Sequence, residues 1–96
     1  LNAGRRETTH FWRDRRGHEV DFLIDRGSTR FAVEAKAGRT ITGDWFRGLQ
    51  YYGDLDDGCP PDHRFVVHGG SERQSRSTGS AVPWREIPEL ARHIVG

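Results

Sequence analysis

The sequence has fifteen basic residues, and only one of them, Lys36, is a lysine. It also has a single cysteine, Cys59, which excludes an internal disulfide bond or a zinc site built from several cysteines. No stretch is long and apolar enough to act as a signal peptide or to span a membrane. We therefore expect a cytoplasmic protein that makes no membrane contact.

The composition predicts one small folded domain over residues 1–96 with a thin hydrophobic core. Leu, Ile, Val and Phe total twenty of the 96 residues, while the net charge of only +1 argues against a disordered chain. The sequence has no methionine and starts at Leu1, so we expect a C-terminal fragment of a larger protein. A partner or further sequence would then complete the core.

Alternating apolar residues and turn signals predict an α/β domain with the order β-β-β-α-β-(β)-α. We expect strands over residues 8–13, 19–24, 30–36 and 64–68, and a further strand over 81–84. A helix is expected from 42 to 52, and a second one from Pro88 to Ile94. The Gly- and Ser-rich residues 69–80 read as a flexible loop.

Four charged residues alternate along the second and third expected strands, namely Glu19, Asp21, Glu34 and Lys36. Strand side chains point to opposite faces with a period of two, so these four can share one face of a hairpin. The register that pairs Asp21 with Glu34 leaves a four-residue loop at 26–29. In this register Val20, Phe22 and Ile24 meet Phe31, Val33 and Ala35 on an entirely apolar opposite face.

Two interpretations of the charged face remain open. Two opposed carboxylates repel each other, and a divalent cation between them would remove that penalty and place a water beside a phosphate. Lys36 escapes a strong bias toward arginine, and unlike arginine a lysine can lose its proton and act as a base. Alternatively the face is solvated, with a surface ion pair between Glu19 and Lys36.

Asp21, followed by Glu34-Ala35-Lys36 on the next strand, resembles the PD-(D/E)XK nuclease superfamily. The run F-W-R-D-R-R-G-H-E-V-D-F-L-I, then V-E-A-K-A-G and W-F-R-G-L, resembles the C-terminal domain of unknown function of prokaryotic AAA+ ATPases. This resemblance implies a restriction-endonuclease-like core, in which Asp21 and Glu34 bind Mg²⁺ or Mn²⁺ and Lys36 orients or activates the attacking water. Glu19 would be a further ligand or an orienting group.

The resemblance carries over less completely at two places. Gln50 lies where exonuclease-type members often have a Gln, but Asp54 replaces the Tyr that follows there, so a solvent-facing helix residue is the other interpretation. The first helix of the family's core has no counterpart upstream of Thr8. No P-loop is present, so ATP would bind only in a separate domain that this sequence does not contain.

Charge is unevenly distributed, with a net +3 over residues 1–18 and −3 over residues 19–68. A group of arginines with one tryptophan near the N-terminus has the chemistry of a nucleic-acid contact, although an ordinary solvated cluster fits equally well. Its members are Arg5, Arg6, Arg13, Arg15, Arg16 and Trp12.

The leading hypothesis is a Mg²⁺-dependent nuclease-like DNA-binding domain that accompanies an ATPase domain of the same protein, with a homodimer as a further expected partnership. A docking or regulatory module with the same fold, or a plain structural domain, are the alternatives.

Overall fold

The structure is a computed structural model that describes residues 7–95. It contains six strands, two α-helices and three short 3-10 helices. In chain order these are β1 (Glu7–Arg13), β2 (Glu19–Arg26), β3 (Thr29–Lys36), η1 (Gly43–Phe46), α1 (Arg47–Leu55), η2 (Pro61–His63), β4 (Arg64–His68), β5 (Gln74–Arg76), β6 (Gly79–Pro83), η3 (Trp84–Glu86) and α2 (Ile87–Val95).

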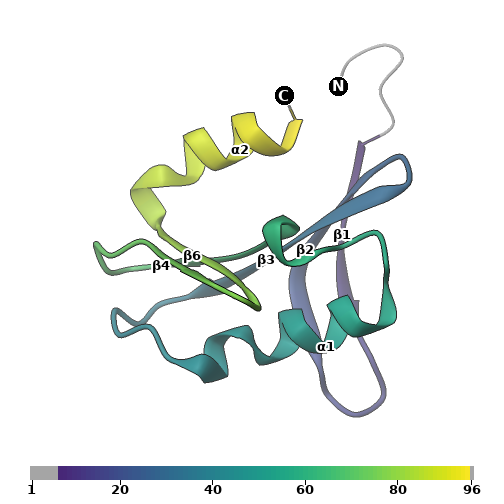
Figure 1. Ribbon diagram of the computed structural model, residues 1–96, viewed down its shortest axis with the longest axis horizontal. Coiled ribbons are helices and arrows are strands. Elements are labelled where there is room, and N and C mark those ends of the chain that lie inside the picture. The colour runs from purple at the N-terminus through teal and green to yellow at the C-terminus, as the bar shows by residue number, and fades with distance from the viewer. Residues whose placement is uncertain (1–6, 96) are drawn as a thin grey trace.

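The strands form one mixed sheet with the order β1-β2-β3-β4-β6-β5. β1, β2 and β3 are a meander of antiparallel strands, β4 runs parallel to β3, and β6 runs parallel to β4. Helix α1 crosses over between β3 and β4 and lies on one face of the sheet, while α2 lies on the opposite face (Figure 1). The predicted α/β class is therefore confirmed, and the order of elements differs from the predicted one by an additional strand, β5.

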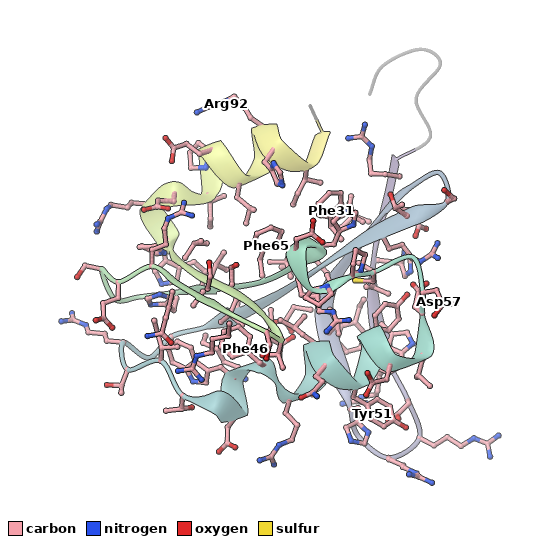
Figure 2. The ribbon with its side chains drawn as sticks, viewed as in Figure 1. Phe31, Phe46, Tyr51, Asp57, Phe65 and Arg92 are labelled. Carbon is pink, nitrogen blue, oxygen red and sulfur yellow. The ribbon has the colours of Figure 1, made fainter. Side chains whose placement is uncertain are left out.

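Each face of the sheet carries its own core. Under α1, Leu23, Ala32 and Val66 of the sheet pack against Phe46 and Leu49. Under α2 the core contains aromatic and branched side chains of the sheet together with the helix residue Ile94 (Figure 2), namely Phe31, Val33, Phe65, Val67 and Val82. β4 is buried along its whole length because both helices cover it, as is typical of a parallel strand between two helical layers.

The expectation that one hairpin face is apolar and the other charged is wrong for two reasons. First, β2 has two residues, Asp21 and Phe22, opposite the single Phe11 of β1, which makes a bulge. This extra residue turns Val20 onto the α1 face together with Leu23, whereas Phe22 and Ile24 stay on the α2 side. Second, α1 covers the face predicted to carry the charges, so Leu23 on that face is only 2% exposed.

Other predicted boundaries also shift. The loop between β2 and β3 has two residues and not four, because Arg26 pairs with Thr29 and Gly27 adopts a positive φ of 69°. Residues 69–80 are not one loop, since Gln74–Arg76 pairs with β6 as the edge strand β5. The first expected helix begins as the 3-10 turn η1, and it continues as α1 three residues beyond its predicted end at Tyr52.

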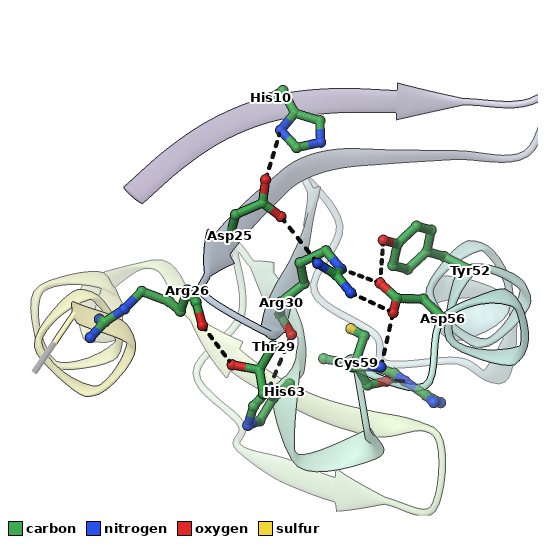
Figure 3. A network of polar contacts seen from close by, with 11 residues as sticks. His10, Asp25, Arg26, Thr29, Arg30, Tyr52, Asp56, Cys59 and His63 are labelled. Carbon is green, nitrogen blue, oxygen red and sulfur yellow. Dashed lines mark hydrogen bonds and ion pairs between the residues drawn. The ribbon is translucent and has the colours of Figure 1, made fainter. Parts of the chain in front are cut away.

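A polar network fixes the end of α1 to the sheet (Figure 3). Asp56 accepts hydrogen bonds from the guanidinium of Arg30 on β3, from the hydroxyl of Tyr52 at 2.5 Å and from the amide of Gly58 at 2.9 Å. Hydrogen bonding by Arg30 and Tyr52 outweighs partial burial and holds the pKa of Asp56 well below its usual range. The carboxylate therefore stays charged and keeps α1 in register with β3.

The α2 side of the sheet is only partly covered. An apolar groove of about 560 Å³ lies between α2 and the strands, and Phe22 and Ile24 of β2 line it with Ile87 and Ile94 of α2. Phe22 is 48% exposed there. No helix within residues 7–95 is long and apolar enough to cross a membrane.

Candidate functional site

The backbone ladder between β2 and β3 ends at the pair Phe22–Val33, one residue before Asp21 and Glu34. The two carboxylates then take over the hydrogen bonding between the strands. The amide of Asp21 donates to Glu34 Oε1 at 3.0 Å, and the amide of Ala35 donates to Asp21 Oδ2 at 2.9 Å. The structure therefore brings together the two residues predicted to bind metal, at the point where β2 and β3 separate.

Lys36 lies beside this carboxylate pair. Its Nζ is 3.7 Å from Glu34 Oε2, and its side chain is 35% exposed while that of Glu34 is only 12% exposed. Within residues 7–95 Glu19 makes no ion pair, so the surface pair between Glu19 and Lys36 that the alternative interpretation required is not formed, and Lys36 pairs with Glu34. The amine is thus held at the rim of the site, between a largely covered carboxylate and solvent.

Helix α1 packs closely against the start of β2. A Cβ on Gly48 would lie 2.6 Å from the carbonyl oxygen of Glu19, so a residue with a side chain does not fit there. Glu19 is half-buried at this contact, whereas Gln50 of the same helix is exposed. Glu19 lies two residues before Asp21 on β2, and its negative charge acts on Glu34. Gln50, in contrast, faces solvent.

The electrostatics of the site are unfavourable to the ionised form of Glu34. Burial raises the pKa of its carboxyl, the hydrogen bond from the Asp21 amide lowers it in part, and the negative charges of Asp21 and Glu19 raise it again. Lys36 offsets some of this repulsion. A cation placed between the carboxylates would act in the same direction as Lys36.

The donor set fits a hard divalent cation such as Mg²⁺ or Mn²⁺. Among the described residues, Asp21 Oδ1 accepts no hydrogen bond, and Glu34 Oε2 makes an ion pair with the ammonium of Lys36. Two carboxylates completed by waters and a phosphate are a usual set of ligands for Mg²⁺. No group of three or more His, Cys, Asp or Glu side chains able to hold a metal is found within residues 7–95.

The predicted nucleic-acid contacts lie at the turn between β1 and β2. Asp14 Oδ1 accepts hydrogen bonds from the amides of Arg16 and His18, both at 2.9 Å, and the His18 ring stacks on Tyr51 at 3.7 Å. Arg13, Arg15 and Arg16 are all exposed at this fixed turn.

Trp12 is engaged differently from these arginines. It packs edge-on against Tyr52, with 5.0 Å between ring centroids, and joins the α1-side core, so only part of the indole is exposed. Arg5 and Arg6 lie outside the described residues.

The sequence interpretation missed the Arg30–Asp56–Tyr52 network and the stacking of His18 on Tyr51. Arg30 and Asp56 are 26 residues apart, and no local pattern connects them. The signal that was available is weak, because Tyr52 and Asp56 have the i, i+4 spacing of neighbours on a helix.

The comparisons with known proteins show the family. The family model described as "Domain of unknown function (DUF4143)" matches residues 1–87. Neither the curated proteins nor the solved structures contain a match to the chain. The chain therefore belongs to the DUF4143 family.

Proposed function

We propose that this member of the DUF4143 family is a nuclease-like domain of the PD-(D/E)XK type, which binds DNA and hydrolyses phosphodiester bonds with Mg²⁺ or Mn²⁺. The observation that carries the proposal is the meeting of Asp21, Glu34 and Lys36 where β2 and β3 separate. The strand order supports it, because a three-stranded meander, a crossover helix and a further strand are the core expected from the resemblance.

The proposed site assigns a different task to each side chain. Asp21 and Glu34 would hold the cation through the carboxylate oxygens that the backbone amides leave available. When bound, the ion supplies positive charge that stabilises the phosphate as negative charge develops on it. Lys36 would orient the attacking water or accept its proton, and Glu19 would assist from the start of β2.

DNA would approach over the turn that carries Arg13, Arg15 and Arg16, with the accessible part of Trp12 beside them. The rigid turn supports this assignment, because arginines on a fixed backbone lose less freedom when they bind phosphates. The ATPase domain of the same protein remains a proposed partner, and ATP would bind there.

The alternative is a docking or regulatory module without catalysis. One observation favours it: both carboxylates already hydrogen-bond to backbone amides of the opposite strand, which is a structural role that needs no metal. Calorimetric titration with Mn²⁺ separates the two functions. We expect binding by the wild type and its loss in Asp21→Asn, whose amide oxygen keeps the bond to Ala35.

Lys36→Arg tests the catalytic assignment. Arginine keeps the positive charge beside Glu34 but does not accept a proton from water, so we expect normal folding and unchanged Mn²⁺ binding. Cleavage of labelled single- and double-stranded DNA should fall by about 10²-fold or more, which is the scale of one acid–base contribution.

The matched control is Arg47→Lys, which is the same exchange in reverse at an exposed residue of α1 and should cleave like the wild type. If the wild type binds no divalent ion and cleaves neither DNA form, the nuclease proposal is wrong. If Lys36→Arg cleaves as fast as the wild type, the role given to the lysine is wrong.

A further inference from the structure

We propose that a single strand of nucleic acid reaches the carboxylate pair across the carboxyl ends of β3, β4 and β6, where Arg39 and Arg85 bind its phosphates and Trp84 stacks on a base. We call this surface, formed by residues 37–40, 69–73 and 84–86, the carboxyl edge. The inference rests on the proposed function, and it concerns a surface separate from the arginines of the β1–β2 turn.

The parallel strands bring the carboxyl edge next to the site. Lys36 pairs with His68, and His68 pairs with Pro83, so the three strands end in one row at the left of Figure 1. Two strand spacings separate Lys36 from the end of β6, a distance of about 10 Å. A nucleic-acid strand bound at this edge is therefore within reach of Glu34 and Lys36.

The three loops of the carboxyl edge contact one another. The amide of Gly69 donates to the carbonyl of Gly38 at 3.0 Å, and Arg85 Nη2 donates to the carbonyl of Ser71 at 3.5 Å. A Cβ on Gly69 would lie 2.9 Å from the carbonyl oxygen of Ala37 and 3.2 Å from the indole nitrogen of Trp84. The absence of a side chain at Gly69 thus lets the loops form one continuous surface.

A buried histidine holds the central loop in place. The Gly70 amide donates to His68 Nδ1 at 3.0 Å, so this nitrogen has no proton, and Nε2 donates to the carbonyl of Glu72 at 2.8 Å. His68 is fully buried, and both of its ring nitrogens are used by the loop that follows it. A surface fixed in this way loses little entropy when a ligand binds.

The carboxyl edge carries a small net positive charge. Its three arginines, Arg39, Arg73 and Arg85, stand against the two acidic residues Glu72 and Glu86.

One of the three arginines is already engaged, because Arg73 pairs with Glu86. Beside the edge, Lys36 belongs to the carboxylate site, and Arg76 bonds to Gln74 and lies over the Phe46 ring. Arg39 and Arg85 are exposed and make no ion pair within residues 7–95, and Arg85 makes only the long hydrogen bond to the Ser71 carbonyl among the described residues. Two such arginines beside a phosphodiester site suit the backbone of a nucleic acid.

Trp84 indicates that the bound nucleic acid is single-stranded. Its side chain is 41% exposed at the start of η3, between the loop at Gly69 and the apolar groove. An exposed aromatic ring beside arginines is the usual platform for an unpaired base, whose ring faces are free to stack. In a duplex the bases stack on each other, so a ring at the edge of the site would gain much less.

The test measures binding of a fluorescent, mixed-sequence single-stranded DNA oligonucleotide by anisotropy, in EDTA and over a series of NaCl concentrations. We expect the double variant Arg39→Gln/Arg85→Gln to raise Kd by about tenfold or more. The slope of log Kd against log salt should fall by about 1.4, because each phosphate contact on a single strand contributes about 0.7. Trp84→Leu should weaken binding by about fivefold or more, while Trp84→Phe keeps most of the affinity.

Arg92→Gln is the matched control, since Arg92 is an exposed arginine that points away from the sheet on α2 (Figure 2) and should change neither Kd nor slope. Thermal melting checks that each variant folds. Unchanged binding by Arg39→Gln/Arg85→Gln, or a loss confined to Arg15→Gln/Arg16→Gln, overturns the carboxyl edge and leaves the proposed nuclease intact. If Arg39→Gln/Arg85→Gln binds the oligonucleotide more weakly while the wild type cleaves no DNA, the carboxyl edge is supported and the proposed nuclease is wrong.

Discussion

At the scale of single residues, Glu34 decides the character of the site. Its side chain is 12% exposed and lies between Lys36 and the acidic residues Asp21 and Glu19. Burial and these negative charges raise its pKa, so the ionised form costs stability in the folded protein without metal. The residue that is proposed to bind the cation is thus a source of instability when no cation is bound.

Glu34→Gln should therefore stabilise the metal-free protein near neutral pH. The amide oxygen still accepts the bond from the Asp21 backbone, while the unfavourable charge is gone, so the melting temperature should rise by a few degrees. Because the pKa of Glu34 is raised in the folded protein, the carboxyl is protonated and costs no stability below its ordinary pKa of 4.5. The wild-type protein then loses stability as the pH rises from that value through the raised pKa. The difference between variant and wild type should accordingly vanish in acid.

Glu72→Gln is the matched control at an exposed glutamate and should change the melting temperature little. Mn²⁺ should reverse the order of the two proteins, because it stabilises only the one that binds it. A Glu34→Gln protein that melts below the metal-free wild type at neutral pH would show that the charge of Glu34 is not a cost.

At the scale of elements, the position of α1 depends on the polar network at its end as much as on its apolar stripe. Phe46, Leu49 and Tyr52 bury one side of the helix, but they do not determine how far it slides along β3. Asp56 determines the position of the helix along β3, because its carboxylate accepts hydrogen bonds both from Arg30 of the strand and from Tyr52 of the helix. The side chains of Arg30 and Asp56 are 28% and 15% exposed, which limits screening by water.

Asp56→Asn should destabilise the protein by about 2 kcal/mol, the size of hydrogen bonds to a charged group. We expect a loss of about 10 °C in melting temperature, because about 1 kcal/mol corresponds to 4–8 °C in a domain of this size. A lowered pKa means that the stabilisation is present above the ordinary value of 3.8 and is lost as the pH falls below it. The difference between the two proteins should thus shrink in acid.

Asp44→Asn is the comparison for this experiment. Its ion pair with Arg47 is exposed by 78% and 74%, so its removal should cost only about 0–1 kcal/mol. Equal losses in Asp44→Asn and Asp56→Asn would mean that the network adds nothing beyond a surface ion pair.

At the scale of the whole molecule, Cys59 reports on the integrity of the α1-side core. It is fully buried in that core between α1 and β4, and burial raises the pKa of its thiol to about 11. Because the thiolate is the reactive form, both exposure and deprotonation require the chain to open. The two covered faces of the sheet unfold together if the domain is cooperative.

Cys59 should therefore react with iodoacetamide at about pH 8 at least about 10²-fold more slowly in the folded protein than in denaturant. The rate should increase in Asp56→Asn by about tenfold for each 1.4 kcal/mol of lost stability, because the population of the open chain depends exponentially on the free energy of unfolding. Fast labelling of the native wild type, at a rate that denaturant does not change, would show that the core opens locally without global unfolding.

The extent to which the sequence predicted the fold follows from the range of each interaction. β4 and the hairpin of β2 with β3 are specified by residues close in the chain, so β4 and the register that pairs Leu23 with Ala32 were predicted correctly, although the turn is two residues shorter than predicted. β5 was missed, because a Ser- and Arg-rich edge strand differs from a loop only through its partner β6. The bulge at Asp21 was also missed, because it arises from pairing with β1.

For the candidate site, the sequence by itself determined which chemical groups come together, since the alternation of Glu19, Asp21, Glu34 and Lys36 already places them on adjacent strands. Only the tertiary structure decided their environment. In the folded chain, burial and the charges of Asp21 and Glu19 make the charge of Glu34 unfavourable, and the separation of β2 from β3 turns both carboxylates into partners of backbone amides. The physical reason is that side-chain direction follows from the local backbone, whereas burial and electric field depend on elements distant in the chain.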